Sequence, residues 1–170
     1  MFAATTQIGE SFVGAGPDAA HVNTVLGRFG SPVETAWATA LATPRPGHVA
    51  FVAVLQPNLP VRPLTLFVNK ATIASDLHAA LTWGAAQAGV AAGVADAVAA
   101  GIVPVPEAAE LLLIAAVWVN PAAAVADAVF TNNRQATAEA LSNGATGIPL
   151  VNDVLAQRDA AFNPYFRPRG

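Results

Sequence analysis

The side chains best suited to chemistry are polar residues that stand in apolar or turn-rich surroundings. His21 follows the turn-rich stretch GAGPD and opens a predicted strand, with Asn23 two residues further on. Because side chains alternate along a strand, His21 and Asn23 lie on the same face. Imidazole can give and take a proton near neutral pH, and an amide both donates and accepts hydrogen bonds. This pair indicates a face on which a ligand could be bound and protonated.

Three further polar residues are candidates for the same site. Lys70, the only lysine of the chain, and Thr72 repeat the two-residue spacing at the end of another predicted strand. Gln87 lies in a helix of small and apolar residues, where a buried amide needs a hydrogen-bond partner. Each residue also has an ordinary structural interpretation: a solvated histidine, a surface lysine, a glutamine that faces water. The residue types alone therefore leave open whether they form a ligand site.

The elements that carry these residues follow from hydrophobic patterning and turn signals. Mixed β-branched and polar runs on either side of GAGPD predict a hairpin of strands at 8–13 and 22–26. Ser31, Pro32 and Glu34 form a capping box, with proline where its missing N–H costs nothing, and begin a helix that ends near residue 42.

The rest of the chain alternates strands with helices. We expect strands at 49–55 (apolar, of the kind buried on both faces), 64–68 and 111–119, and helices at 76–100, 121–141 and within 149–162. The proline-rich residues 56–63 predict an extended connection. Gly84, Gly89 and Gly93 indicate a close approach by another helix, a sheet or a ligand. This order predicts an α+β fold, a two-layer α/β sandwich with helices on one face, in a single domain over residues 1–170.

Composition excludes several classes of function. Apolar residues make up 54% of the chain and charged residues only 11%. So few charged residues cannot cover the surface of a soluble monomer, so we expect a homo-oligomer. Apolar runs are too short or too interrupted for a membrane span, and no secretory leader opens the chain, so a cytoplasmic location is expected. The eight basic residues are scattered and the net charge is −3, which disfavours nucleic acid. Without cysteine, and with three histidines that lack ligand spacing, no metal is expected.

Five consecutive blocks of sequence carry a resemblance to a known family. They are GESFVGAG followed by His21, GSPVETAWATAL, AVLQPNLP, PLTLFVNKATI and GAAQAGVAAGVADAVAAGIVP. In this order and at this spacing the chain resembles the formaldehyde-activating enzyme family, and weaker similarity continues to Pro164. The resemblance implies a ribosomal protein S5 domain 2-like fold and assembly into a homopentamer, which would hide the weakly charged surface.

The resemblance also implies a function. Members of this family are lyases that condense formaldehyde with tetrahydromethanopterin, a reduced pterin used as co-substrate, to give methylene-tetrahydromethanopterin and water without a metal. His21 matches the proposed proton donor of the family. The family's substrate contacts fall on Asn23, Val52, Lys70, Thr72 and Gln87. By this resemblance Val52 packs on the pterin, and Lys70, Thr72 and Gln87 hydrogen-bond its polar edge.

Two residues depart from the family pattern. Asn23 stands where the family has an acid, and Ala88 stands where it commonly has a histidine. An acid two residues after His21 would accept from pterin N–H groups and favour the imidazolium ion, whereas Asn keeps the shape without the charge. An alternative function is therefore a non-catalytic or weakly active homologue that binds a reduced pterin or formaldehyde adduct as a carrier or sensor. A third is a structural ring protein without a small ligand.

Overall fold

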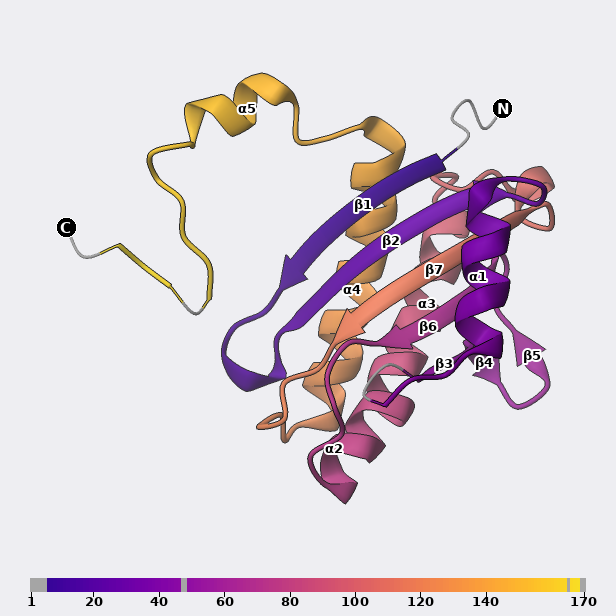
Figure 1. The fold of residues 1–170 in the computed structure, drawn as a ribbon, viewed down its shortest axis with the longest axis horizontal. Coiled ribbons are helices and arrows are strands. Elements are labelled where there is room, and N and C mark those ends of the chain that lie inside the picture. Colours follow the sequence, from indigo (N-terminus) through magenta and orange to yellow (C-terminus); the bar gives the residue numbers. More distant parts are fainter. Residues whose placement is uncertain (1–5, 47–48, 165, 169–170) are drawn as a thin grey trace.

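A five-stranded sheet forms the centre of the molecule in the computed structural model, which describes residues 6–46, 49–164 and 166–168. The strand order is β1 (Thr6–Val13), β2 (Ala20–Arg28), β7 (Leu111–Trp118), β6 (Leu64–Asn69) and β3 (Ala50–Val52). Only the β6–β7 pair is parallel, and the other three pairs of this sheet are antiparallel. The observed mixture of helices with a mostly antiparallel sheet confirms the α+β class (Figure 1).

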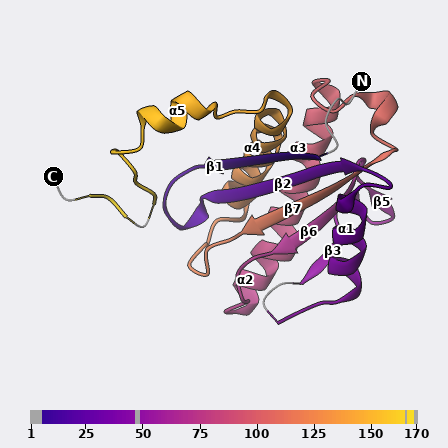
Figure 2. The ribbon, with the colours of Figure 1, turned by 45° about the horizontal axis from the view of Figure 1, so that its top comes forward.

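A layer of helices covers one face of the sheet (Figure 2). It consists of α2 (Asp76–Ala80), the π-helical turn Leu81–Ala86, α3 (Gln87–Ala99) and α4 (Ala126–Thr146). Val22 and Leu26 of β2 face this layer and are buried in the main hydrophobic core. A Cβ atom on Gly89 or Gly93 would lie 2.4 Å from a backbone oxygen of α4. The close approach expected at these glycines is therefore made by another helix, whereas Gly84 faces open space.

The opposite face of the sheet, which bears His21, Asn23 and Val25 and is called the front face below, is only partly covered. Helix α1 (Pro32–Ala42) lies across one end of it, as Figure 1 shows. The expectation that all helices share one face is therefore wrong for α1. Gly27 explains this placement: a Cβ atom there would lie 2.6 Å from a methyl carbon of Val33, so its absence lets α1 fold back onto β2.

The predicted cap of α1 is present with one change. The Ser31 hydroxyl accepts a hydrogen bond from the Val33 N–H at 3.3 Å, as expected of an N-cap. The Glu34 carboxylate accepts from the N–H of Gly30 at 2.7 Å, one residue before the cap. The predicted end near residue 42 is confirmed.

The strand predicted at 49–55 is broken. The N–H group of Ala53 still donates to the Thr65 oxygen in the main sheet, but the carbonyl of Ala53 accepts from the N–H group of Val61. The chain therefore leaves the main sheet at Ala53. Beyond this point β4 (Val54–Gln56) pairs with β5 (Leu59–Pro60) in a small separate hairpin. The expected extended connection over 56–63 is therefore partly a hairpin. β3 is a half-buried edge strand, not one buried on both faces.

The helix predicted from Pro121 begins instead at Ala126. The Asp18 carboxylate accepts hydrogen bonds from the N–H groups of Ala124 and Val125, which hold residues 120–125 in a turn. Helix α4 then runs beyond the predicted end and stops where Gly147 takes a left-handed φ of 66°.

Short elements complete the chain. They are two 3-10 turns, Gly16–Asp18 and Val105–Glu107, and the exposed helix α5 (Val151–Ala156). The described residues from α5 to 168 extend past the β1 edge of the sheet (Figure 1).

Candidate functional site

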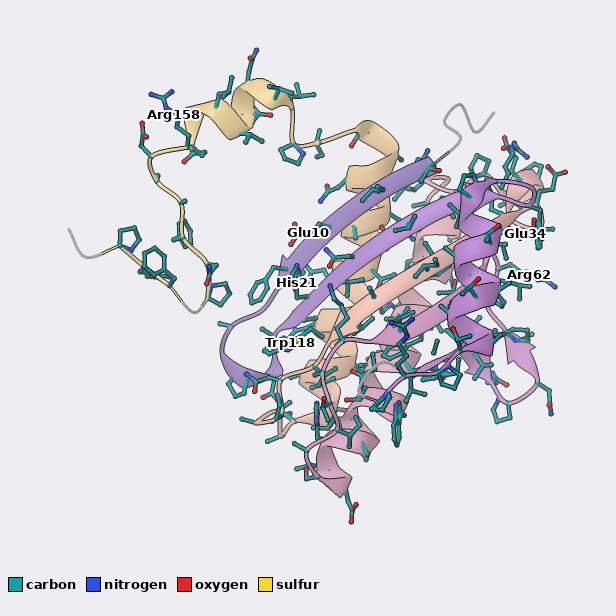
Figure 3. All side chains as sticks on the ribbon, viewed as in Figure 1. Glu10, His21, Glu34, Arg62, Trp118 and Arg158 are labelled. Atoms are coloured by element: carbon teal, nitrogen blue, oxygen red, sulfur yellow. The ribbon has the colours of Figure 1, made fainter. Side chains whose placement is uncertain are left out.

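The end of the front face that α1 leaves uncovered carries the candidate site. The register of the sheet sets His21 of β2 between Phe12 of β1 and Trp118 of β7. Figure 3 shows His21 and Trp118 at this end of the sheet, with Glu10 beside them. A cleft of about 1160 Å³ lies here, bounded by the β1–β2 turn, His21, Trp118 and the C-terminal segment, which contributes Phe162 and Arg167. A histidine therefore lines an open cleft with aromatic walls.

His21 contacts a carboxylate from the neighbouring strand. Its Nε2 atom lies 2.9 Å from Oε1 of Glu10, and both side chains are partly exposed, at 39% and 58% respectively. The Phe12 ring lies beside the imidazole, with ring centroids 6.0 Å apart. Glu10 was not among the residues predicted from the sequence. The sequence does show a carboxylate within the strand predicted at 8–13, but only the strand register shows that this carboxylate reaches His21.

Asn23 and Lys70 meet on the same face. The parallel register of β6 against β7 brings the end of β6 close to β2, and the Lys70 N–H donates to the Val117 oxygen at 2.9 Å. From there Nζ of Lys70 donates to Oδ1 of Asn23 at 3.2 Å. The structure therefore brings three of the predicted residues, His21, Asn23 and Lys70, together at one end of the front face.

Two buried polar residues hold the loop that follows Lys70. Asn69 accepts from the Ala71 N–H at 3.1 Å and donates to its carbonyl at 2.5 Å. The fully buried His78 accepts from the Ala74 N–H through Nδ1 at 3.1 Å. Its Nε2 lies 3.0 Å from the Val119 oxygen, so this nitrogen is the donor. The exposed Thr72 lies within this loop. The sequence had predicted that Thr72 stands at the end of a strand.

The described ranges show neither a metal site nor a membrane helix. No three His, Cys, Asp or Glu side chains in them are grouped as a metal site would require. None of the helices there has the length and apolar character needed to cross a bilayer.

Comparison with known proteins identifies the family of the chain. Residues 8–166 match the family described as "Formaldehyde-activating enzyme (Fae)". The chain belongs to this family. It is 41% identical over 160 residues to the "5,6,7,8-tetrahydromethanopterin hydro-lyase" of Methanosarcina barkeri. This match covers 94% of this chain and 90% of that protein. The resemblance read from the five sequence blocks is confirmed.

Members of the formaldehyde-activating enzyme family also occur within longer proteins. The "Bifunctional enzyme Fae/Hps" of Archaeoglobus fulgidus is 39% identical over 160 residues, and that of Methanothrix thermoacetophila is 36% identical over 157 residues. The match covers 94% and 92% of this chain, respectively, but only 40% of each bifunctional protein.

Two of the contacts implied by the formaldehyde-activating enzyme family lie away from His21 in a single copy. Val52 is on the front face but at the opposite edge of the sheet, three strands from β2, or about 14 Å at the usual strand spacing. Gln87 lies in the helix layer behind the sheet, 8% exposed, and its Nε2 donates to the Val54 oxygen at 2.9 Å. The buried amide thus has the partner it needs, but the chain does not bring Gln87 or Val52 to the His21 cleft.

Proposed function

We propose that this chain condenses formaldehyde with tetrahydromethanopterin to give methylene-tetrahydromethanopterin and water, and that His21 is the general acid. The observation that carries the proposal is a histidine in an open cleft of a chain 41% identical to a tetrahydromethanopterin hydro-lyase. The activity is that of a carbon–oxygen lyase. In this reaction tetrahydromethanopterin is a co-substrate, and no step needs a metal.

The chemistry asks for one proton that is given and then recovered. A pterin-system nitrogen adds to formaldehyde, and its proton moves to the oxygen, which leaves a carbinolamine. His21 protonates the hydroxyl, the C–O bond breaks and water leaves. A second substrate nitrogen then attacks the resulting iminium carbon and returns a proton to His21. An imidazole suits this cycle because it exchanges protons near neutral pH, and holding the two nitrogens in line supplies the remaining acceleration.

The residues beside His21 are suited to bind the polar edge of a pterin. With Oδ1 of Asn23 accepting from Lys70, the Asn23 amide nitrogen remains as a donor, where an acid would only accept. Lys70 and Thr72 add a cation and a hydroxyl from the end of β6 and the loop behind it. Phe12 and Trp118 offer apolar surface on either side of His21, against which a flat ring can pack.

We further propose that the site is completed by a second copy of this chain. Val52 and Gln87 are among the implied substrate contacts, yet they lie on a different edge and behind the sheet. A head-to-tail ring would let one copy offer His21 while its neighbour offers Gln87, and the homopentamer implied by the family is such a ring. Exposed apolar side chains on α5, such as Val151 and Leu155, are consistent with burial in an oligomer.

Three further expectations remain part of the proposal. The chain acts in the cytoplasm, and residues 1–170 form one domain. The finer fold class is the ribosomal protein S5 domain 2-like fold. It is supported by the parallel β6–β7 pair, which is joined through the helix layer within an otherwise antiparallel sheet.

The test is a condensation assay against the spontaneous rate. Wild-type protein should accelerate formation of methylene-tetrahydromethanopterin, and His21→Gln should remove at least a hundredfold of that acceleration, the usual scale of general acid catalysis, roughly 10²–10⁴. Gln keeps the size and hydrogen bonding of the side chain but cannot exchange a proton. If the wild-type protein binds the pterin saturably without accelerating the reaction, the carrier or sensor alternative holds instead. Full activity in His21→Gln would reject His21 as the acid.

A further inference from the structure

We infer that Glu10 is a positioning residue for His21, whose carboxylate holds the Nε2–H group so that Nδ1 is the nitrogen presented to the substrate. The catalytic consequence rests on the proposed function. The contact itself does not, and it can be measured without substrate.

The position of Glu10 follows from the hairpin. In the β1–β2 register Glu10 pairs with Asn23 and Phe12 pairs with His21, so Glu10 is the diagonal neighbour of His21 on the front face. Diagonal pairs across antiparallel strands are within reach of long side chains. Glu10 bridges this gap and places Oε1 2.9 Å from Nε2 of His21. The contact is built into two consecutive strands with eight paired positions, so it does not depend on a loop.

The chemistry of the pair fixes which nitrogen acts. An ionised carboxylate only accepts hydrogen bonds, so Nε2 of His21 must carry the hydrogen. Neutral His21 therefore keeps its lone pair on Nδ1, and the imidazolium ion has its transferable proton there. Other charged or polar groups lie near this pair: Arg167, Asn120 and Asn163 line the cleft, and the neutral Asn23 accepts from the Lys70 ammonium group. Glu10 thus supplies negative charge in direct contact with the ring.

This arrangement suits a proton that leaves and returns at one atom. Nδ1 of His21 gives its proton to the hydroxyl that departs as water, and recovers a proton at the same atom when the second nitrogen closes the ring. The Nε2–H···Oε1 hydrogen bond persists throughout, and Glu10 itself neither gains nor loses a proton. An orienting carboxylate plays the same part beside histidine in hydrolase triads.

The experiment compares Glu10→Ala with Glu110→Ala. Glu110 is also an exposed glutamate that forms an ion pair with a residue of β2, but that residue is Arg28, at the other end of the strand from His21. Glu10→Ala should lower kcat about tenfold and leave KM within about twofold, because general acid catalysis depends on the orientation of the acid. Added formate should restore much of the lost kcat in Glu10→Ala, and should change neither Glu110→Ala nor His21→Gln. Unchanged kcat, or a loss that formate does not restore, would overturn the inference.

A second measurement is independent of activity. In the wild-type protein at low temperature, the Nε2–H proton of His21 should exchange with water more slowly than it does without the Glu10 carboxylate, and should give a downfield resonance assigned by its absence in His21→Gln. This resonance should be lost in Glu10→Ala and in Glu10→Met, which keeps the length of the side chain without its oxygens and is the variant to use if alanine disturbs folding. If the resonance is absent from wild type or survives in both variants, Glu10 does not hold the ring. If it behaves as expected while the wild type has no lyase activity, the proposed function fails and the positioning role stands.

Discussion

The packing of α3 on α4 makes a sharp prediction for Gly93. A Cβ atom added there would lie 2.4 Å from the Arg134 oxygen and 2.8 Å from Cβ of Thr137, and both contacts belong to α4. Ordinary contacts begin near 3.4 Å, so the two helices would have to separate by about 1 Å. The obstacle is the backbone of α4, and a side-chain rotation cannot remove it. Gly93→Ala should therefore destabilise the fold.

The size of the effect comes from two opposing contributions. Forcing extra atoms into a packed interface costs about 1–3 kcal/mol. Replacing glycine by alanine within a helix returns about 0.5–1 kcal/mol, because glycine loses more conformational freedom on folding. Because the contact at Gly93 is with backbone, the cost lies in the upper half of that range, about 2–3 kcal/mol. The net loss expected for Gly93→Ala is then about 1–2.5 kcal/mol, which for a chain of this length corresponds to a fall in Tm of about 2–10 °C.

Gly84 is the matched control. It lies earlier in the same helical region, and nothing lies within 4 Å of the Cβ atom that alanine would add. Gly84→Ala should leave the stability unchanged or raise it by up to about 1 kcal/mol. Urea unfolding of both variants, followed by circular dichroism at one fixed protein concentration, measures the difference. A Gly93→Ala protein as stable as wild type, or an equal loss in Gly84→Ala, would refute the reasoning.

Two further predictions concern acid stability and the proposed oligomer. A hydrogen bond from Arg134, with a smaller contribution from its charge, holds the pKa of the Asp96 carboxyl below its usual range. A carboxyl whose pKa is lowered by folding adds stability at neutral pH, and this stability is lost as the pH falls. In thermal melts, the stability of Asp96→Asn should therefore fall less between pH 7 and pH ~3 than that of wild type. The difference should be small, because the pair is exposed, and added salt should remove it. For the oligomer, His21→Gln and Gln87→Met should each be weakly active, but a co-refolded equal mixture should regain about one quarter of wild-type activity, because one interface in four of a head-to-tail ring receives both native residues. No gain over the separate variants would show that the two residues do not serve a shared site.

The strands and the first helix could be predicted because their signals are local. Alternation and turn residues mark the hairpin of β1 and β2, and Ser31 with Pro32 marks the start of α1. The errors occur where distant residues decide. The helix α4 begins later than predicted because of Asp18, which lies more than a hundred residues earlier in the chain. Its carboxylate accepts hydrogen bonds from the N–H groups of Ala124 and Val125, which would have belonged to the first turn of a helix beginning at Pro121. The apolar run at 49–55 breaks because Ala53 is shared between two sheets.

The candidate site divides in the same way. That His21 and Asn23 share a face follows from the period of a strand, so the sequence alone predicts it. That Lys70 reaches Asn23 depends on the parallel register of β6 and β7, and that Glu10 reaches His21 depends on the register of β1 and β2. A shift of one residue in either pairing would turn the side chain to the helix layer, and no local signal excludes such a shift.

The exposure of the His21–Glu10 pair bears on how the site works. In water a half-exposed pair is weak, because solvent screens both partners. Proton transfer gains most when the cleft is dry, since electrostatic interactions strengthen as the local dielectric falls. A flat pterin packed against Phe12 and Trp118 would displace water from this end of the sheet, and a neighbouring copy that brings Gln87 would displace more. The pair is therefore expected to reach full strength only in the bound assembly, so the loss of activity in Glu10→Ala should exceed any loss of stability in the free protein.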